Sequence, residues 1–249
     1  MNTEFAQLEE TLKKIGGGKT MYYVANRGNW GDALIRYGTL KFLREKGISF
    51  RELTLRKREW LLPILKGGVV LYGGGGAWCK LFNQSPRHVG MLRRRFKVIV
   101  LPSTYELRSS IPNVTFFCRD LFESKENSPD ATFCHDMSFY IGPRSSPKGS
   151  GRGYFFRTDE GSARKIDIPA ENVDLSAKGH QYSSMEPFFA EIAKYSTVFT
   201  DRLHVAIASC LLGKEVHLYS GSYFKNRSVY LSSIEGYFDN VHFHTEFSL

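Results

Sequence analysis

The chain has 249 residues, of which 42% are hydrophobic and 24% are charged. This composition excludes disordered, collagen-like and coiled-coil proteins. The length is sufficient for one large domain or two small ones. The formal net charge of +9 lies entirely in residues 1–142, which carry 22 Lys+Arg and 13 Asp+Glu, whereas residues 143–249 carry 12 of each. A basic half predicts an anionic partner, which is a nucleic acid, a membrane surface or a phosphorylated substrate.

The first part of the chain alternates helical and apolar segments. An amphipathic helix over residues 3–15 is predicted to end at three glycines, and a second helix over about 32–46 follows a Gly/Asn loop. Continuous apolar strands are expected at residues 21–24, 69–72, 97–101 and 114–118. Apolar strands that alternate with helices are typical of a parallel sheet covered on both faces.

A second α/β pattern begins after the Gly-, Pro- and Ser-rich residues 142–153, which are typical of a linker. Its strands are expected at 154–156, 196–200 and 216–219, and its helices at 185–195 and 205–212. The sequence therefore predicts a basic N-terminal α/β domain over 1–142, a linker over 143–153 and a C-terminal α/β domain over 154–249. We expect two Rossmann-like halves that face a cleft, with ligands at the carboxyl ends of the strands.

The expected cellular compartment is inferred from the absence of targeting, membrane-spanning and paired-cysteine patterns in the sequence. The N-terminal residues show no basic stretch followed by an apolar core, and no run approaches about 18 apolar residues, so neither a signal peptide nor a membrane span is predicted. The four cysteines, Cys79, Cys118, Cys134 and Cys210, lie far apart without CxxC spacing. This spacing favours reduced thiols over a zinc site or disulfides, and we expect a cytoplasmic protein.

Two glycine-containing loops follow predicted strands. In the first, Asn29, Gly31 and Asp32 precede a helix, where backbone amides attract anions and Asp32 is expected to be the N-cap. A plain strand-to-helix turn explains this loop equally well. In the second, four glycines at residues 73–76 cost backbone entropy on folding, so a ligand or another backbone is expected to approach Gly74 and Gly75 closely. No Lys-Ser/Thr follows, which excludes a Walker phosphate loop.

Arginine and histidine side chains follow two strands of the second half. Arg157 and Asp159 come directly after the strand at 154–156, and either face a ligand or belong to a solvated charged loop. Arg202 and His204 stand between a strand and a buried helix. Arg202 can clamp a phosphate or carboxylate with two hydrogen bonds, and His204 can move a proton near neutral pH unless it is only structural.

Two further segments have a structural and a functional interpretation. His135 and Asp136 form either a hydrogen-bonded catalytic pair or a structural cap. The arginines at 93–95 are a surface cluster that a solvated helix face also explains.

Taken in order, these segments resemble the polysaccharide pyruvyl transferase family over residues 26 to about 212. The matching pieces are Asn29-x-Gly31-Asp32, the glycines at 73–76, Arg119-Asp120 with Glu123-Ser124, His135-Asp136, Arg157-x-Asp159-x-Gly161 and Asp201-Arg202-Leu203-His204 before an alanine-rich helix. The resemblance implies a fold similar to the two-domain GT-B glycosyltransferases. It also implies transfer of a pyruvyl group from phosphoenolpyruvate to two hydroxyls of a sugar, which forms a ketal.

The resemblance further implies that Arg202 and His204, together with Arg157, lie at the phosphoenolpyruvate. His204 is the expected acid/base, and Asp136 or Asp159 is expected to orient or assist it. The remaining substrate-binding candidates are Asn29, Gly31, Asp32, Gly74, Gly75 and Arg119. No cofactor is expected, and no metal-ligand spacing is present.

Three other functions remain open at this point: a GT-B-type glycosyltransferase that uses a nucleotide sugar, a basic nucleic-acid-binding protein, and an inactive sugar-binding homologue. No recognised nucleic-acid-binding motif is present, so no nucleic-acid partner is expected. The acceptor is a free saccharide, a nucleotide sugar or a lipid-linked intermediate. In the last case the basic half would meet its anionic carrier, with the protein bound peripherally at the inner membrane face.

Overall fold

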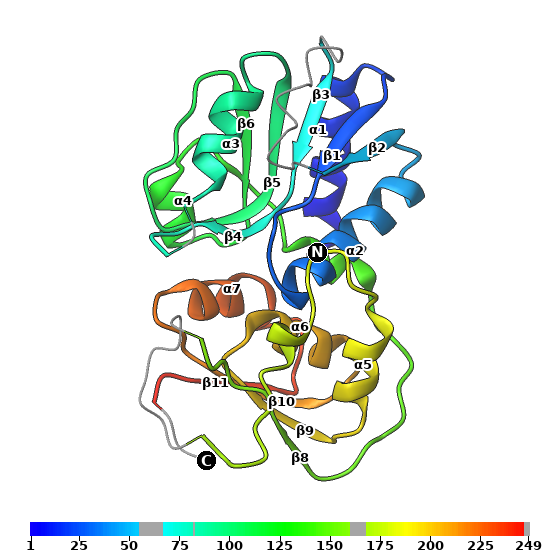
Figure 1. Ribbon diagram of the computed structural model, residues 1–249, viewed down its shortest axis with the longest axis vertical. Coiled ribbons are helices and arrows are strands. Elements are labelled where there is room, and N and C mark those ends of the chain that lie inside the picture. Colours follow the sequence, from blue (N-terminus) through cyan, green and yellow to red (C-terminus); the bar gives the residue numbers. More distant parts are fainter. Residues whose placement is uncertain (55–66, 82, 160–167, 247–249) are drawn as a thin grey trace. The chain divides into compact units, whose positions relative to one another are not determined.

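The computed structural model describes residues 1–54, 67–81, 83–159 and 168–246. The chain divides into two compact units, each built on a parallel sheet with helices (Figure 1). Unit 1 comprises Met1–Asn26 and Thr39–Tyr140, and unit 2 comprises Arg27–Gly38 and Ile141–Leu249. The predicted α/β class with mostly parallel strands is confirmed, and similarity to the GT-B glycosyltransferases stays a prediction. Residues 27–38 group with the C-terminal part of the chain, which the sequence does not indicate.

In unit 1 the strand order is β2-β1-β3-β5-β6-β7, and β4 pairs with β5 beside this path. The strands are β1 (Met21–Val24), β2 (Phe50–Leu53), β3 (Val69–Tyr72), β4 (Gly75–Trp78), β5 (Lys97–Tyr105), β6 (Val114–Cys118) and β7 (Thr132–Phe133). The strands predicted at 21–24, 69–72 and 114–118 are confirmed. Strand β5 runs past its predicted end at Leu101 because Ser103 pairs with Gly75 and Cys118, and Tyr105 pairs with Trp78.

The helices of this unit are α1 (Asn2–Gly16), the second part of α2 (Trp30–Glu45), α3 (Ser85–Leu92), α4 (Glu123–Asn127) and the 3-10 helix η2 (Met137–Ile141). Helix α1 ends at the predicted glycines, where Gly17 adopts the left-handed conformation (φ 55°) and its amide donates to the carbonyl of Lys13, as helix C-caps commonly do. The ring of Phe5 packs against those of Phe42 and Tyr140, with centroids 6.1 and 5.1 Å apart. This contact joins α1 to α2 and η2.

The glycines at 73–76 allow backbone segments to approach one another. Asn26, two residues after β1, donates its side-chain amide to the carbonyls of Gly73 and Gly74, at 2.9 and 2.6 Å. A Cβ on Gly74 would lie 2.3 Å from the carbonyl oxygen of Pro102 in β5. Gly75 begins β4 with φ 116°, a conformation that favours glycine. Of the two explanations open from the sequence, approach of another backbone therefore accounts for Gly74.

Unit 2 is built on a four-stranded parallel sheet in the order β11-β10-β9-β8. Its elements are β8 (Arg152–Tyr154), the 3-10 helix η3 (Leu175–Lys178), α5 (Glu186–Ala193), β9 (Thr197–Thr200), α6 (Leu203–Leu211), β10 (Glu215–Tyr219), α7 (Lys225–Ser233) and β11 (Val241–His244). The strand predicted at 154–156 lies two residues earlier, within the end of the expected linker. It ends there because the amide of Phe156 donates to the side chain of Asn172 instead of to a neighbouring strand.

Helix α6 is the buried helix that the sequence predicts at 205–212. It contacts α5, β9 and β10, and His204 is its least buried residue. The residue before it, Arg202, is extended (φ −89°, ψ 106°). The helix therefore starts directly at the carboxyl end of β9, with His204 in its first turn.

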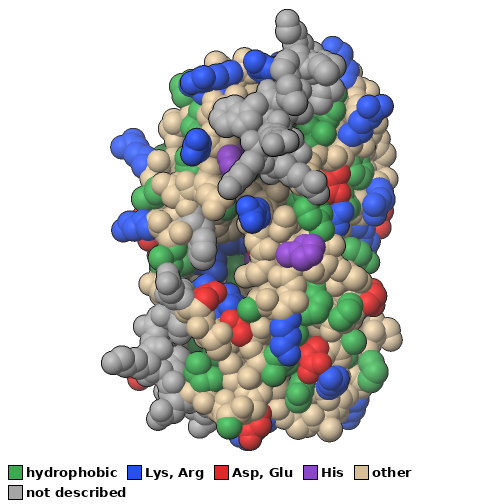
Figure 2. Space-filling view, in the orientation of Figure 1, with side chains coloured by type: hydrophobic (Ala, Val, Ile, Leu, Met, Phe, Trp, Pro, Cys, Tyr) green, Lys and Arg blue, Asp and Glu red, His purple; other side chains and the backbone are tan. Residues whose placement is uncertain are grey.

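Unit 1 carries most of the excess positive charge, as residues 1–142 do in the sequence. Its sequence carries 20 Lys+Arg and 12 Asp+Glu, whereas that of unit 2 carries 14 and 13. On the face drawn in Figure 2, Lys and Arg side chains are scattered over unit 1, and residues 93–95 are exposed. Among the described residues, no helix is both long and apolar enough to cross a membrane.

Candidate active site

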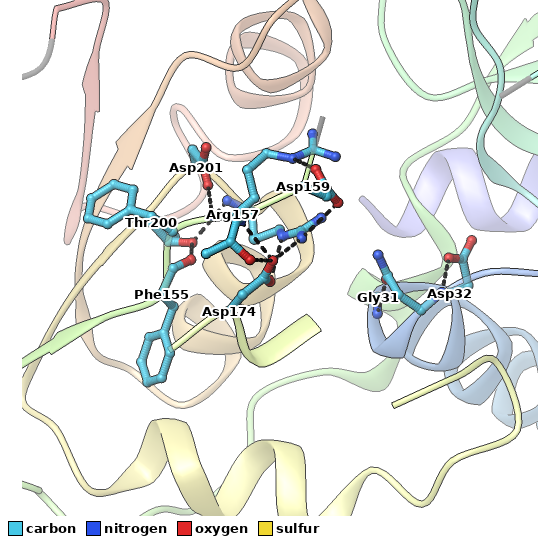
Figure 3. Close-up of polar contacts among 12 residues, drawn as sticks. Gly31, Asp32, Phe155, Arg157, Asp159, Asp174, Thr200 and Asp201 are labelled. Atoms are coloured by element: carbon cyan, nitrogen blue, oxygen red, sulfur yellow. Dashed lines mark hydrogen bonds and ion pairs between the residues drawn. The ribbon is translucent and has the colours of Figure 1, made fainter. Parts of the chain in front are cut away.

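The candidate site of unit 2 begins at the carboxyl ends of β8 and β9. These strands are paired in register, with Tyr154 opposite Phe199, so the residues that follow them emerge at the same edge of the sheet. The hydroxyl of Thr200 donates to the carbonyl of Phe155 (2.7 Å) and accepts the amide of Arg202 (2.9 Å). This hydroxyl fixes the backbone from which Arg202 projects (Figure 3).

Arg202 is held by Asp174, which lies just before η3. Its Nε donates to Oδ1 of Asp174 at 3.0 Å and its Nη2 to Oδ2 at 2.5 Å, so the pair is bidentate. The two side chains are only 8% and 7% exposed. Burial alone would lower the pKa of the Arg202 guanidinium, but Asp174 and Asp159 outweigh it, and the pKa is raised. Arg202 is therefore a fixed cation with a fixed orientation.

Asp159 bridges the two arginines (Figure 3). Its Oδ1 accepts the Nε of Arg157 at 2.7 Å and its Oδ2 accepts the Nη2 of Arg202 at 3.0 Å. The Asp159 side chain is 45% exposed, whereas that of Arg157 is 8% exposed. Partial burial opposes ionisation, yet the hydrogen bond of Arg157 and the charges of both arginines prevail and lower the pKa of Asp159 to about 2. Asp159 is thus ionised at any physiological pH.

Asp201 secures the backbone of Arg157. Its Oδ1 accepts the Arg157 amide at 2.8 Å, and its own carbonyl accepts the side-chain amide of Asn226 at 2.8 Å. Burial raises the pKa of Asp201, although hydrogen bonding and the charges of Arg157 and Arg202 oppose this shift. This buried carboxylate ties the loop after β8 to the end of β9.

Three guanidinium nitrogens remain directed away from these carboxylates: Nη1 and Nη2 of Arg157 and Nη1 of Arg202. They make no hydrogen bond to the residues that the structure describes. A guanidinium edge of this kind binds carboxylate or phosphate oxygens with parallel hydrogen bonds. The arrangement can therefore hold an anion. Glu160 and Gly161 of the predicted motif lie outside the described residues.

Gly31 lies against the ring of His204. A Cβ on Gly31 would lie 2.6 Å from the Nδ1 of His204 and 3.1 Å from its Cγ. Only a residue without a side chain therefore leaves the imidazole in this position. The contact brings a residue of the first turn of α2 to the predicted acid/base.

Asn29 and Asp32 cap helix α2 together. The Oδ1 of Asn29 accepts the amide of Gly31 (2.8 Å), and the Oδ2 of Asp32 accepts the amide of Asn29 (2.9 Å). This is the reciprocal geometry of a capping box. The prediction that Asp32 is the N-cap is wrong, because the helix starts at Trp30 and Asn29 takes that position.

The loop and first turns of α2 are anchored within unit 2. The indole of Trp30 donates to the carbonyl of Ser184 (2.8 Å) and packs 5.4 Å from the ring of Phe188. The amide of Gly28 donates to the side chain of Gln181 (3.2 Å). Unit 2 thus contains seven of the predicted site residues: Asn29, Gly31, Asp32, Arg157, Asp159, Arg202 and His204.

The other four candidates, Gly74, Gly75, Arg119 and Asp136, belong to unit 1. Arg119 and Asp136 are both 0% exposed and form an ion pair of 2.5 Å. Arg119 also donates to Thr104, and the second oxygen of Asp136 accepts the amide and hydroxyl of Ser138. Such burial fits a structural ion pair rather than contact with a substrate. The roles of Asp136 in catalysis and of Arg119 in substrate binding stay predictions, and the burial of both side chains favours a structural role.

His135 lies in an apolar surrounding. Its Nε2 is 3.4 Å from a carboxylate oxygen of Glu4, and its ring is 5.0 Å from that of Phe133. Burial lowers the pKa of His135 to about 4 despite the nearby carboxylate. A neutral, buried imidazole favours the structural interpretation of His135. Among the described residues, no group of three or more His, Cys, Asp or Glu side chains is arranged to hold a metal ion.

Residues 29–223 match the family model described as polysaccharide pyruvyl transferase. The chain belongs to the polysaccharide pyruvyl transferase family. The match begins at Asn29 and includes every unit 2 residue of the candidate site. The family indicates a transferase that moves a pyruvyl group, with a polysaccharide acceptor in general.

The fold of this pyruvyl transferase family member also has a solved relative. A crystal structure of a protein of uncharacterized function from Klebsiella pneumoniae subsp. pneumoniae NTUH-K2044 is 25% identical in sequence and superimposes with a TM-score of 0.81. The match covers 99% of this chain and 100% of that chain. No curated protein matches the chain.

Asp174 is the site residue of the pyruvyl transferase that sequence reasoning misses. It lies in a loop after the predicted strand at 154–156, and its partner Arg202 is 28 residues away. No spacing rule links the two. The available signal is indirect: an arginine buried at a strand end needs a carboxylate partner.

Replacing Asp136 with alanine should destabilise the protein by about 3–5 kcal/mol, because it leaves the Arg119 cation buried without its partner. Urea unfolding measures this change. The matched control is Asp130→Ala, since Asp130 is exposed and should change stability by no more than about 0.5 kcal/mol. Equal stability of the two variants would show that the Arg119–Asp136 pair is dispensable.

Proposed function

We propose that the protein transfers the pyruvyl group of phosphoenolpyruvate to two hydroxyls of a saccharide, which forms a pyruvate ketal and releases phosphate. One observation carries the proposal. Arg157 and Arg202 are bridged by one carboxylate at the carboxyl ends of two paired strands, and His204 follows in the first turn of α6. Membership of the pyruvyl transferase family supports the transferred group.

The donor has two anionic groups, a carboxylate and a phosphate ester, attached to the same carbon. The guanidinium nitrogens of Arg157 and Arg202 offer hydrogen-bond donors for both groups. Because Asp174 orients Arg202 and Asp159 bridges it to Arg157, the two cations are held before the donor arrives. Such preorganisation lowers the entropy lost when the donor binds.

The chemistry needs protons to move at two places. The methylene carbon of the donor gains a proton and becomes a methyl group, while a sugar hydroxyl oxygen attacks the neighbouring carbon. Phosphate then leaves, and the second hydroxyl oxygen forms the second bond of the ketal. Of the two hydroxyl protons, one accounts for the proton that the methylene carbon gains, and the other leaves with phosphate. We assign proton transfer to the His204 imidazole, because histidine is the side chain that most often serves as a general acid and base in enzymes.

In this proposal, His204 is held in place by three residues: Asn29, Gly31 and Asp32. Gly31 leaves space for the imidazole, and the cap formed by Asn29 and Asp32 fixes the backbone of Gly31. They are positioning residues rather than groups that react. The predicted part of Gly75 in substrate binding stays a prediction, because its conformation is also explained by the start of β4.

The acceptor is proposed to carry negative charge. Unit 1 holds the excess of Lys and Arg, whereas the donor residues lie in nearly neutral unit 2. The donor therefore does not account for the charge of unit 1. A saccharide on an anionic carrier, such as a diphosphate-linked lipid, fits this excess.

Changing His204 to alanine, or Arg202 to alanine, should lower acceptor-dependent phosphate release from phosphoenolpyruvate by about 10²-fold or more, the range for loss of a general acid/base or a charge-stabilising group. A phosphate-release assay measures this rate. The control is His242→Ala, because His242 is a half-exposed histidine on β11 and should leave the rate unchanged. Normal turnover by His204→Ala would remove His204 from the mechanism.

Gly31→Ala should lower kcat because its methyl group would press on the His204 ring. The double variant Gly31→Ala/His204→Ala should be no slower than His204→Ala alone, since both changes act through one imidazole. Additive losses would mean that Gly31 acts independently of His204. A second glycine change, Gly90→Ala, serves as the control, because a Cβ there would contact nothing within 4 Å.

A further inference from the structure

The arginine cluster carries no net positive charge in the arrangement described. Arg157 and Arg202 face the carboxylates of Asp159 and Asp174, and the buried Asp201 accepts the Arg157 amide beside them. A donor with two anionic groups must bind where two cations are already matched by carboxylates. Simple addition of such an anion would leave an excess of negative charge in a partly buried site, which is unfavourable.

We propose that Asp159 is a placeholder carboxylate: it occupies the anion position between Arg157 and Arg202 and is displaced by an anionic group of the donor. This inference rests on the proposed function, because it takes the bound ligand to be phosphoenolpyruvate. The Asp159 carboxylate bridges the two guanidiniums at 2.7 and 3.0 Å. A carboxylate of the donor has the same oxygen spacing and charge as Asp159, and a phosphate offers more oxygens and more charge, so either group can replace both contacts.

Of the two carboxylates, Asp159 is the more exposed to solvent. It is 45% exposed and accepts one hydrogen bond from each arginine. Asp174 is 7% exposed, binds Arg202 through two nitrogens and accepts the backbone amide of Thr158 at 2.9 Å. The hydroxyl of Thr158 also donates to Asp174, at 3.3 Å. Displacing Asp174 would therefore break four hydrogen bonds of a nearly buried side chain, whereas Asp159 is already almost half exposed to solvent.

The placeholder has two consequences for donor recognition. A ligand must replace both contacts of Asp159, so an anion that reaches both arginines is favoured over one that reaches a single arginine. The competition is also independent of pH in the physiological range, because the pKa of Asp159 is about 2 and the carboxylate stays ionised. Asp159 thus sets the affinity and selectivity of the donor site without taking part in the reaction.

The test is the affinity of Asp159→Asn for phosphoenolpyruvate, inorganic phosphate and pyruvate, each measured by calorimetry at pH 6 and pH 8. Asparagine keeps the size and one acceptor oxygen but removes the competing charge. We expect phosphoenolpyruvate to bind at least about tenfold more tightly than to the unchanged protein, the scale of one hydrogen bond to a charged group, by the same factor at both pH values. A gain with phosphate or with pyruvate identifies which donor group takes the place of Asp159.

Two further variants make the result decisive. Asp159→Ala should also bind the donor more tightly, and it gives a second reading should the asparagine variant unfold. Asp239→Asn removes a negative charge at an exposed position of unit 2 and should leave the affinity unchanged. Weaker or unchanged binding by Asp159→Asn, with the control unaffected, would overturn the placeholder and make Asp159 a residue that only orients the arginines.

The outcomes also separate this inference from the proposed function. If the unchanged protein converts phosphoenolpyruvate but Asp159→Asn binds it less well, the function stands and the placeholder fails. If no variant binds phosphoenolpyruvate while Asp159→Asn binds phosphate more tightly than the unchanged protein, the placeholder stands and the donor is a different phosphorylated compound.

Discussion

The candidate site depends on the buried ion pair between Arg202 and Asp174. It joins the start of α6 to the loop before η3, and through the amide of Thr158 it also reaches the end of β8. Two nearly unexposed charges are stable here only because each satisfies the other, and loss of either would leave an uncompensated charge. The orientation of Arg202, and with it the place where an anion can bind, follows from this pair.

Around this pair the site is built from elements distant in sequence. Asp201 holds the backbone of Arg157, Asp159 bridges Arg157 to Arg202, and the capped loop before α2 brings Gly31 to His204. The carboxylates match the arginine charges while the outward guanidinium edges stay available. In the exchange that we propose, an anionic group of the donor takes the place of the Asp159 carboxylate between the two arginines.

Sequence reasoning finds the residues with strong local signals. Apolar runs predict β1, β3 and β6, and arginine and histidine beside the end of β9 predict the donor site. Strand β2, with the polar residues Arg51 and Glu52, lacks such a run and is missed. Asp174 is missed because only tertiary folding brings it to Arg202. The burial of Asp136 against Arg119 also cannot be predicted from the spacing of the two residues. Local sequence patterns thus predict helices and strands, whereas the fold decides which charged side chains form ion pairs with one another.

We propose that this chain moves the three-carbon unit of phosphoenolpyruvate onto a saccharide. The most direct measurement is mass spectrometry of saccharide and lipid-linked acceptors after incubation with phosphoenolpyruvate in which all carbons are ¹³C. We expect the acceptor to gain one labelled pyruvyl group, bound through two oxygens, for each phosphate released. An acceptor that gains no label but is extended by a sugar from a nucleotide-sugar donor would contradict it.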